Sequence, residues 1–337
     1  MTSTMLGSTA PEAKDPTPVP IAIPTNRDRG DRVYRALATF GGTVTFVLMA
    51  LIAVFLLTRG WDALRVAGWR FFTEQGWEPG AGRFGIGSML PYTVVIALVA
   101  LFIAVPVSIG VALFITECAP RRIRRPLTSL VDVLAAVPSL IYGLWGLFFL
   151  QPRLLPLSRW LGDHLGFIPI FGVSGEGPRP LSLFAGSAFV AGIVVSLMVI
   201  PICTAVMREV FSQTPAGEKE GALALGGTRW GVIRDVVLPF GRSGIIGGSM
   251  LGLGRALGET IAVTLLISVA FDWKWSVIEQ GGNSIAAHIA LRFSESTEFG
   301  ISALMGAGLV LFAITLVVNA AASVVVARSR TGAATEI

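Results

Sequence analysis

The sequence predicts an all-α polytopic membrane protein with about six transmembrane helices. Apolar residues make up 53% of the 337 residues and charged residues only 14%, whereas soluble domains carry roughly 25% charged residues. Several apolar stretches are long enough to cross a hydrocarbon core of about 30 Å, and the mean hydropathy is +0.73. Most arginines lie between these stretches, not on one basic face with interleaved aromatic residues. Soluble enzymes, disordered chains and nucleic-acid-binding domains are therefore excluded.

The first 30 residues differ from the rest of the chain. They are rich in proline and lack the apolar core of a secretory signal peptide. We expect residues 1–30 to be a disordered cytoplasmic tail and residues 31–337 to form the transmembrane domain.

Six apolar stretches define the expected spans, at about 36–57, 90–116, 127–150, 181–205, 245–270 and 301–326. The segments richest in arginine precede the first span, separate the second from the third and the fourth from the fifth, and follow the sixth. With six spans all four segments lie on one side, and basic loops mark the cytoplasmic side. The sequence predicts a multi-pass protein of a bacterial cytoplasmic membrane, in contact with lipid, with both termini in the cytoplasm.

The opposite loops are aromatic at their edges, notably at Trp61, Trp69, Trp77, Trp273 and Trp275. Such residues fit an interfacial belt at headgroup depth or a docking surface for an external partner. Two cysteines and two histidines provide neither a disulfide framework nor an intramembrane metal cluster, so we expect no metal site and no catalytic site.

The cytoplasmic loop 207–243 is too long for a simple turn. Thr214 and Pro215 are placed to begin a helix that ends near Gly226, since a hydroxyl residue can cap a helix and glycine favours the left-handed conformation after it. Thr228 is placed to cap a second amphipathic helix that ends at Leu238 and Pro239. The sequence predicts two short helices joined by a glycine hinge.

The fifth stretch contains the deepest charges. Gly248, Gly252, Arg255 and Glu259 share one face of a helix, and glycines at this spacing let another helix approach closely. Arg255 lies twelve residues after Ser243, about 18 Å into the membrane at 1.5 Å per residue. The two charges are one turn apart and can pair. They either line a translocation pathway for an anion or form a structural pair that fixes helix register.

Two residues of the third stretch are candidates for a gate. Asp132 lies about one turn inside the expected span and either lines the pathway or faces cytoplasmic water. Pro138 is expected to kink the same helix, with Ser139 available to satisfy the freed backbone groups.

The cytoplasmic loop resembles the EAA loop of binding-protein-dependent ABC importer permeases, the type I, MetI-like class. Glu220 begins the motif and is followed by Ala222, by Gly226 six residues after Glu220, and by Leu238 and Pro239 eighteen and nineteen residues after it. Gly221 replaces an alanine and Val236 an isoleucine of the family pattern. The resemblance implies that this loop contacts a cytosolic ATPase. That ATPase is expected to be a separate chain, because no lysine here follows a glycine as a P-loop requires.

Four further stretches resemble the PstC-type membrane subunit of phosphate ABC importers: FGIGSMLPYTVVIAL, AVPVSIGVALFITECAP, AAVPSLIYGLWGLF and GRALGETIAV. The resemblance implies a transporter subunit, not an enzyme, that moves inorganic phosphate by alternating access, with Arg255 and Glu259 important for transport. It implies three partners: a PstA-like second permease, a dimeric PstB-like ATPase and a PstS-like extracytoplasmic phosphate-binding protein. ATP and Mg would bind the ATPase, and this chain would hold no cofactor.

Other functions remain open at this stage. A permease for another oxyanion, molybdate or sulfate, would have the same kind of EAA loop. A secondary transporter would work alone on an ion gradient, and a membrane-embedded enzyme would need clustered catalytic groups at one depth.

Overall fold

The computed structural model describes residues 29–174, 177 and 179–330. The expected tail of residues 1–30 therefore lies, except for Arg29 and Gly30, outside the described residues. The chain forms two compact units, Met1–Leu51 and Ile52–Ile337. Helix α1 (Arg29–Ala67) belongs to both units, and its first part is the described portion of the smaller unit.

In the larger unit the end of α1 packs on α14 (Glu298–Arg330). A Cβ atom at Gly60 would lie 2.7 Å from the backbone nitrogen of Gly306, so glycine is required at this helix crossing. The Ser302 hydroxyl bonds to the Arg59 carbonyl oxygen at 2.8 Å and fixes the same contact.

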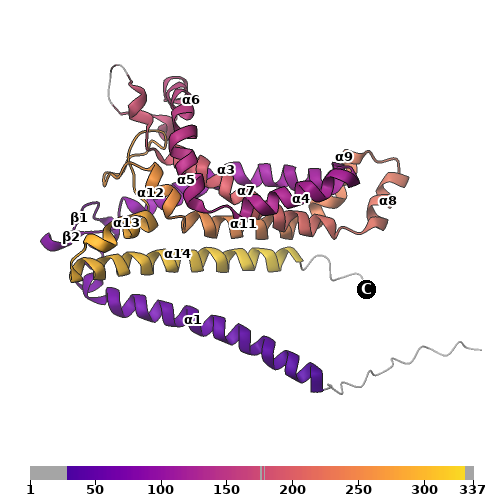
Figure 1. Cartoon of the computed structure of the whole chain (residues 1–337), viewed down its shortest axis with the longest axis horizontal. Helices are drawn as coiled ribbons and strands as arrows, with labels where there is room; N and C mark the ends of the chain where they lie inside the picture. The colour runs from indigo at the N-terminus through magenta and orange to yellow at the C-terminus, as the bar shows by residue number, and fades with distance from the viewer. Residues whose placement is uncertain (1–28, 175–176, 178, 331–337) are drawn as a thin grey trace, which may run out of the picture. The chain divides into compact units, whose positions relative to one another are not determined.

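The core of the larger unit is formed by α3 (Met89–Leu113), α7 (Ala188–Ser212) and α11 (Arg242–Leu257), with α14 lying along α11 (Figure 1). A Cβ atom at Gly192 would meet Val99, which brings α7 close to α3. The Ser108 hydroxyl reaches across to the Ile200 carbonyl oxygen at 3.1 Å. Small residues thus allow the tight packing that apolar attraction alone does not produce between helices in lipid.

The predicted third span is broken, and its predicted bounds of 127–150 are wrong. Helix α4 (Arg121–Ala136) ends before Pro138, and the chain continues as α5 (Ser139–Trp145), a π-helical turn (Gly146–Leu150) and α6 (Gln151–His164). Val137 is extended, with φ −65° and ψ 129°, as steric conflict with a following proline favours. The Tyr142 hydroxyl, not Ser139, donates to the Leu134 carbonyl oxygen at 3.0 Å.

Short elements lie at the end of the larger unit opposite residues 207–243, the predicted coupling loop (Figure 1). They are α2 (Arg70–Thr73), the antiparallel strands β1 (Trp77–Glu78) and β2 (Arg83–Phe84), α12 (Ile261–Leu266) and α13 (Ile285–Arg292). Single 3₁₀ turns lie at Pro79–Ala81, Pro169–Phe171, Leu181–Phe184 and Phe293–Glu295. Phe71, Phe84 and Ile285 are fully buried here or nearly so and form a second apolar core. The end is therefore a packed cap and not a set of loose loops.

The coupling loop contains α8 (Ala216–Ala224), α9 (Arg229–Val232), a π-helical turn (Ile233–Val237) and α10 (Leu238–Phe240). The helix of residues 229–240 meets α11 at 65°. A Cβ atom at Gly241 would overlap the Phe211 ring, so the bend depends on glycine.

Within the described residues, five helices are long and apolar enough to span a membrane: Gly30–Ala67, Met89–Cys118, Ser139–His164, Ala188–Ser212 and Glu298–Val324. Counting the bent pair of residues 229–240 and 242–257 as a further span gives six. The predicted all-α fold with about six spans is confirmed.

Candidate functional site

The glycine face of α11 packs directly on α7, as predicted. A Cβ atom at Gly252 would lie 2.6 Å from Cys203 Sγ and 2.7 Å from a Val199 methyl group. At Gly248 it would lie 3.2 Å from the Cys203 carbonyl oxygen, and the Cys203 thiol donates to the Gly248 carbonyl oxygen at 3.1 Å. Both glycines are buried, so they set the spacing of two spans and hold the helix that carries Arg255.

The predicted pairing of Arg255 with Glu259 is wrong: in the described part of the chain no ion pair joins them. Helix α11 ends at Leu257, and Gly258 caps it, so the four-residue helical spacing between the two charges is interrupted. Glycine has a low helix propensity, about 1 kcal/mol below alanine, which favours a break here. Arg255 is exposed, whereas Glu259 is 8% exposed and its Oε1 accepts from the Ala262 amide at 3.4 Å. Glu259 thus contacts the first turn of α12, not the arginine.

Arg255 lies in the last turn of α11, far from the end of the helix that follows the coupling loop. It is thirteen positions after Arg242 at the start of α11, which corresponds to a rise of about 20 Å at 1.5 Å per residue. Next to it in the sequence, Gly254 faces the Asn319 side chain, whose Oδ1 would lie 3.6 Å from a Cβ atom at Gly254. Asn319 is not among the residues predicted from the sequence. A polar amide within the apolar run of residues 316–322 could have indicated a functional position, because polar groups are rare in membrane spans. The arginine and an exposed amide therefore lie at one level of the membrane domain.

The coupling loop contains the two predicted helices, with changes at their ends. Pro215, not Thr214, precedes α8, and the Thr214 hydroxyl bonds back to the Phe211 carbonyl oxygen at 2.9 Å. Gly226 has φ +86°, the left-handed conformation that favours glycine, and ends the helix as predicted. Thr228 caps α9 through its hydroxyl, which accepts from the Gly231 amide at 3.1 Å, also as predicted.

The predicted end of the second helix at Leu238 and Pro239 is wrong, since the helix continues to Phe240. Pro239 falls in the first turn after a π-helical turn, at a helix start where its missing N–H removes little. Leu238 packs against the main core, while Pro239 is exposed. These two residues precede the 65° bend into α11.

The outer surface of the coupling loop is exposed and partly apolar. Glu220 is exposed and Ala222 is half-buried against the core. Leu225 is 91% exposed and Trp230 is 63% exposed. An apolar surface beside a free carboxylate is typical of a protein-binding site.

Asp132 and Pro138 occupy different settings. Asp132 lies on α4 with its side chain 56% exposed, and its Oδ1 is 3.9 Å from a guanidinium nitrogen of Arg208 on α7. This contact ties α4 to the core near the coupling loop. Pro138 lies at the break between α4 and α5, where a change in angle between two helices requires few other adjustments.

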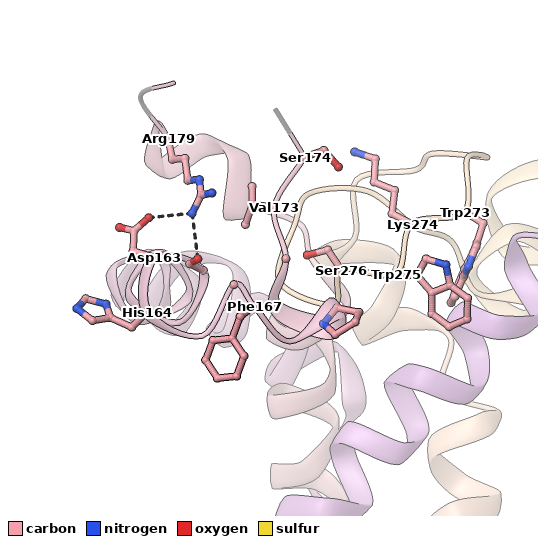
Figure 2. A pocket seen from close by; sticks show the side chains of 14 residues that line it. Asp163, His164, Phe167, Val173, Ser174, Arg179, Trp273, Lys274, Trp275 and Ser276 are labelled. Carbon is pink, nitrogen blue, oxygen red and sulfur yellow. Dashed lines mark hydrogen bonds and ion pairs between the residues drawn. The ribbon is translucent and has the colours of Figure 1, made fainter. Parts of the chain in front are cut away.

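The opposite end of the molecule has a hollow of about 720 Å³ (Figure 2). Its walls come from the end of α6, from the following loop and from the segment of Trp273–Ser276. Arg179 pairs with Asp163 at 3.0 Å, and Lys274 pairs with the buried Glu279. Trp275 is 71% exposed, whereas Trp273 packs on Tyr92. The aromatic residues are therefore divided between the packed cap and an open surface.

A solved structure shares this fold. A chain of a bacterial alginate ABC transporter, solved with an alginate-bound periplasmic protein, superposes with a TM-score of 0.58 at 17% identity, over 91% of this chain and 97% of that chain. At that identity the likeness concerns the fold alone, which is the predicted type I, MetI-like permease fold.

Residues 104–331 match the family described as binding-protein-dependent transport system inner membrane component, and the chain belongs to this family. A relative from Mycobacterium tuberculosis, "Phosphate transport system permease protein PstC 2", is 44% identical over 87% of this chain and 91% of its own length. The Xylella fastidiosa protein "Phosphate transport system permease protein PstC" is 44% identical over 89% and 93%. The chain is thus a multi-pass transport permease and not an enzyme, and its family implies an ATPase and a binding protein as partners.

Proposed function

We propose that this chain is a membrane subunit of a phosphate importer, which moves inorganic phosphate across the bacterial cytoplasmic membrane by alternating access. The main support is the 44% identity to phosphate permeases over nine-tenths of both chains. The aligned part includes Arg255 and the coupling loop. ATP hydrolysis then takes place on a separate dimeric PstB-like subunit that binds ATP and Mg. A PstA-like permease and a PstS-like binding protein complete the assembly, and both termini of this chain lie in the cytoplasm.

In this proposal Arg255 attracts the anion on its way through the membrane. The backbone of this exposed arginine lies about 20 Å along the helix from the start of α11, and a charge near the middle of a membrane costs roughly 3 kcal/mol on insertion scales. Such a positive charge increases the affinity of a transport site for an anion. Gly248 and Gly252 hold α11 against α7, and Glu259 holds the break between α11 and α12, so both act on the pathway by position.

The coupling loop binds the ATPase through its exposed side. Glu220, Leu225 and Trp230 form that surface, and α8 is a rigid body between Pro215 and the left-handed Gly226. Leu238, Pro239 and the bend at Gly241 connect the loop to α11, while Asp132 and Pro138 lie on the α4–α5 segment that we propose moves with the gate.

The test is uptake of radiolabelled phosphate into proteoliposomes that contain the assembled importer. Arg255→Gln should lower uptake at least tenfold with normal assembly, and Arg255→Lys should retain part of it. Arg242→Gln, an exposed charge at the start of the same helix, is the matched control and should change uptake little. Normal uptake by Arg255→Gln would overturn the pathway role.

A second arm tests the substrate and the energy source. Unlabelled phosphate should compete with the label, whereas sulfate and molybdate should not. Competition by those anions would favour the other-oxyanion permease. Uptake by this chain alone on an ion gradient would favour a secondary transporter.

A further inference from the structure

An ion pair joins the coupling loop to the end of the second span. Lys219 on α8 places its Nζ 2.7 Å from Oε1 of Glu117, which lies 102 positions away in the sequence. The two side chains are 23% and 16% exposed, so both are largely removed from water. The Arg234–Asp235 pair in the same loop is 74% and 71% exposed and 3.8 Å long. Short ion pairs with little exposure resist separation far more than exposed ones do.

Helix α8 has two different sides. Lys219 and Ala222, three residues apart, are half-buried on one side of the helix, whereas Glu218 and Glu220 are exposed. Beside the pair is a hollow of about 250 Å³, lined by Glu117, Cys118, Lys219, Leu223, Arg229, Val232 and Ile233. In this nine-residue helix, Lys219 thus faces the membrane domain, whereas its neighbours Glu218 and Glu220 face the solvent.

Glu117 belongs to a firmly held part of the chain. It lies in a π-helical turn (Phe114–Cys118) that continues α3 without a break. An Arg124 guanidinium nitrogen donates to the Thr116 carbonyl oxygen at 2.6 Å and braces this turn from α4. Since α3 packs along α7 and α11, a force on Glu117 acts on the core of the membrane domain.

We infer that the Lys219–Glu117 ion pair transmits the movement of α8 to the second span, α3. The inference rests on the proposed function, in which the ATPase binds the outer side of α8. On its C-terminal side α8 is joined to the next helix only through Gly226 and Gly227, which act as a hinge, so the backbone there couples α8 weakly to α11. Lys219 and Glu117 are positioning residues: they touch neither nucleotide nor substrate, and they make α8 and α3 move together.

Swapping the charges of Lys219 and Glu117 in the reconstituted importer tests whether this ion pair couples α8 to α3. Lys219→Glu and Glu117→Lys should each lower phosphate uptake and the stimulation of ATP hydrolysis by the binding protein at least tenfold. Basal hydrolysis and the KM for ATP should stay within about twofold, because the ATPase surface is intact. The double exchange restores opposite charges and should recover most of the stimulation. The matched control exchanges Arg234 and Asp235 and should change neither activity.

Cys118 supplies a second readout, independent of transport. It is exposed and lines the hollow, whereas Cys203, the other cysteine, is buried. In the purified wild-type chain a maleimide probe should label Cys118 more slowly than in the unfolded chain, because Lys219 and Leu223 of α8 line the same hollow. Each single exchange should speed labelling severalfold as α8 separates from α3, and the double exchange should restore the slow rate. If the charge reversals fail to fold, Lys219→Met and Glu117→Gln test the same predictions.

Three results would overturn the inference: single variants with wild-type stimulation, a double exchange that restores neither activity nor labelling, or labelling unchanged in every variant. If the wild-type assembly takes up no phosphate, the proposed function fails. The labelling arm then still decides whether the pair holds α8 to α3.

Discussion

Gly252 has no room for a side chain in the interface of α11 with α7. A Cβ atom there would overlap both Cys203 Sγ and Val199, while Gly247 on the same helix has nothing within 4 Å of that position. The two glycines therefore differ only in their surroundings. Gly252 limits the distance between two spans, and Gly247 lowers helix stability without a packing role in this chain.

Gly252→Ala should destabilise the purified chain by about 1–3 kcal/mol, the usual effect of overpacking. Gly247→Ala should leave it unchanged or raise stability by up to about 1 kcal/mol through helix propensity. Thermal unfolding in mild detergent, followed by size-exclusion chromatography, compares the two. Equal melting temperatures would contradict the tight α7–α11 contact.

His288 lies on α13, outside the candidate spans, and is 1% exposed. Its ring packs against Trp77 with centroids 4.4 Å apart, and its Nδ1 lies 2.9 Å from the Asn283 amide nitrogen. Burial, together with the charge of Arg292, lowers the pKa of His288 from 6.5 to about 4. The folded chain therefore keeps this imidazole neutral at a pH where the unfolded chain protonates it.

A lowered histidine pKa makes the unfolded state bind more protons, so stability should fall as the pH drops from about 6.5 to about 4. A difference of this size is worth about 3 kcal/mol at the acid end. Melting temperatures across this range should show a slope that His288→Gln flattens. His164→Gln, at an exposed ring, should leave the slope as it is. An unchanged slope in His288→Gln would refute the assignment.

Among the elements, the helices of the coupling loop are too short to be stable without caps and packing. Helix α9 depends on the Thr228 hydroxyl at its start, and Gly226 ends α8. The hydrogen-bonding of Thr and the backbone freedom of Gly are local properties, so these two boundaries are predictable from sequence. The end at Phe240 is not, because it depends on a π-helical turn that packs Val237 into the core.

Thr228→Ala should cost about 1 kcal/mol of local helix stability, and Thr228→Ser should restore most of it. Amide hydrogen exchange of residues 229–233 is the measurement, with severalfold faster exchange expected in the alanine variant only. Exchange in α7 should not change. Equal protection in the alanine variant would show that the cap is not needed.

Longer elements show where sequence patterns stop. The apolar run 127–150 predicts one span, yet Pro138 and the extended Val137 divide it, and the long helix begins at Ser139. The run 245–270 also predicts one span, but α11 ends at Leu257 and the chain continues as the separate helix α12. In both places hydropathy identifies a stretch of the chain that lies in lipid, while proline or glycine determines where the helices end.

At the scale of the whole molecule, the coupling loop and the aromatic cap lie at opposite ends of the packed helices α3, α7 and α11 (Figure 1). Basic residues cluster near the loop end, at Arg121–Arg125 and Arg208. We expect that end in the cytoplasm, since arginine resists transfer across the membrane. The hollow of Figure 2 then opens to the outside.

Thiol labelling in cells tests this orientation. A membrane-impermeant maleimide should label the exposed Cys118 only after the membrane is opened. In a Cys118→Ser background, Ser174→Cys at the outer hollow should be labelled in intact cells. Labelling of Cys118 in intact cells would reverse the topology.

The sequence by itself determined the solvent, the number of spans, the family and the coupling motif, because hydropathy, charge placement and residue spacing are properties of the linear chain. It also located Arg255, since a deep charge is conspicuous in an apolar run. Tertiary structure decided which charges meet. Arg255 and Glu259 would be one turn apart on a continuous helix, yet the helix break at Gly258 separates them. Lys219 and Glu117 are 102 positions apart and form an ion pair, because the fold brings α8 next to the π-helical turn that follows α3.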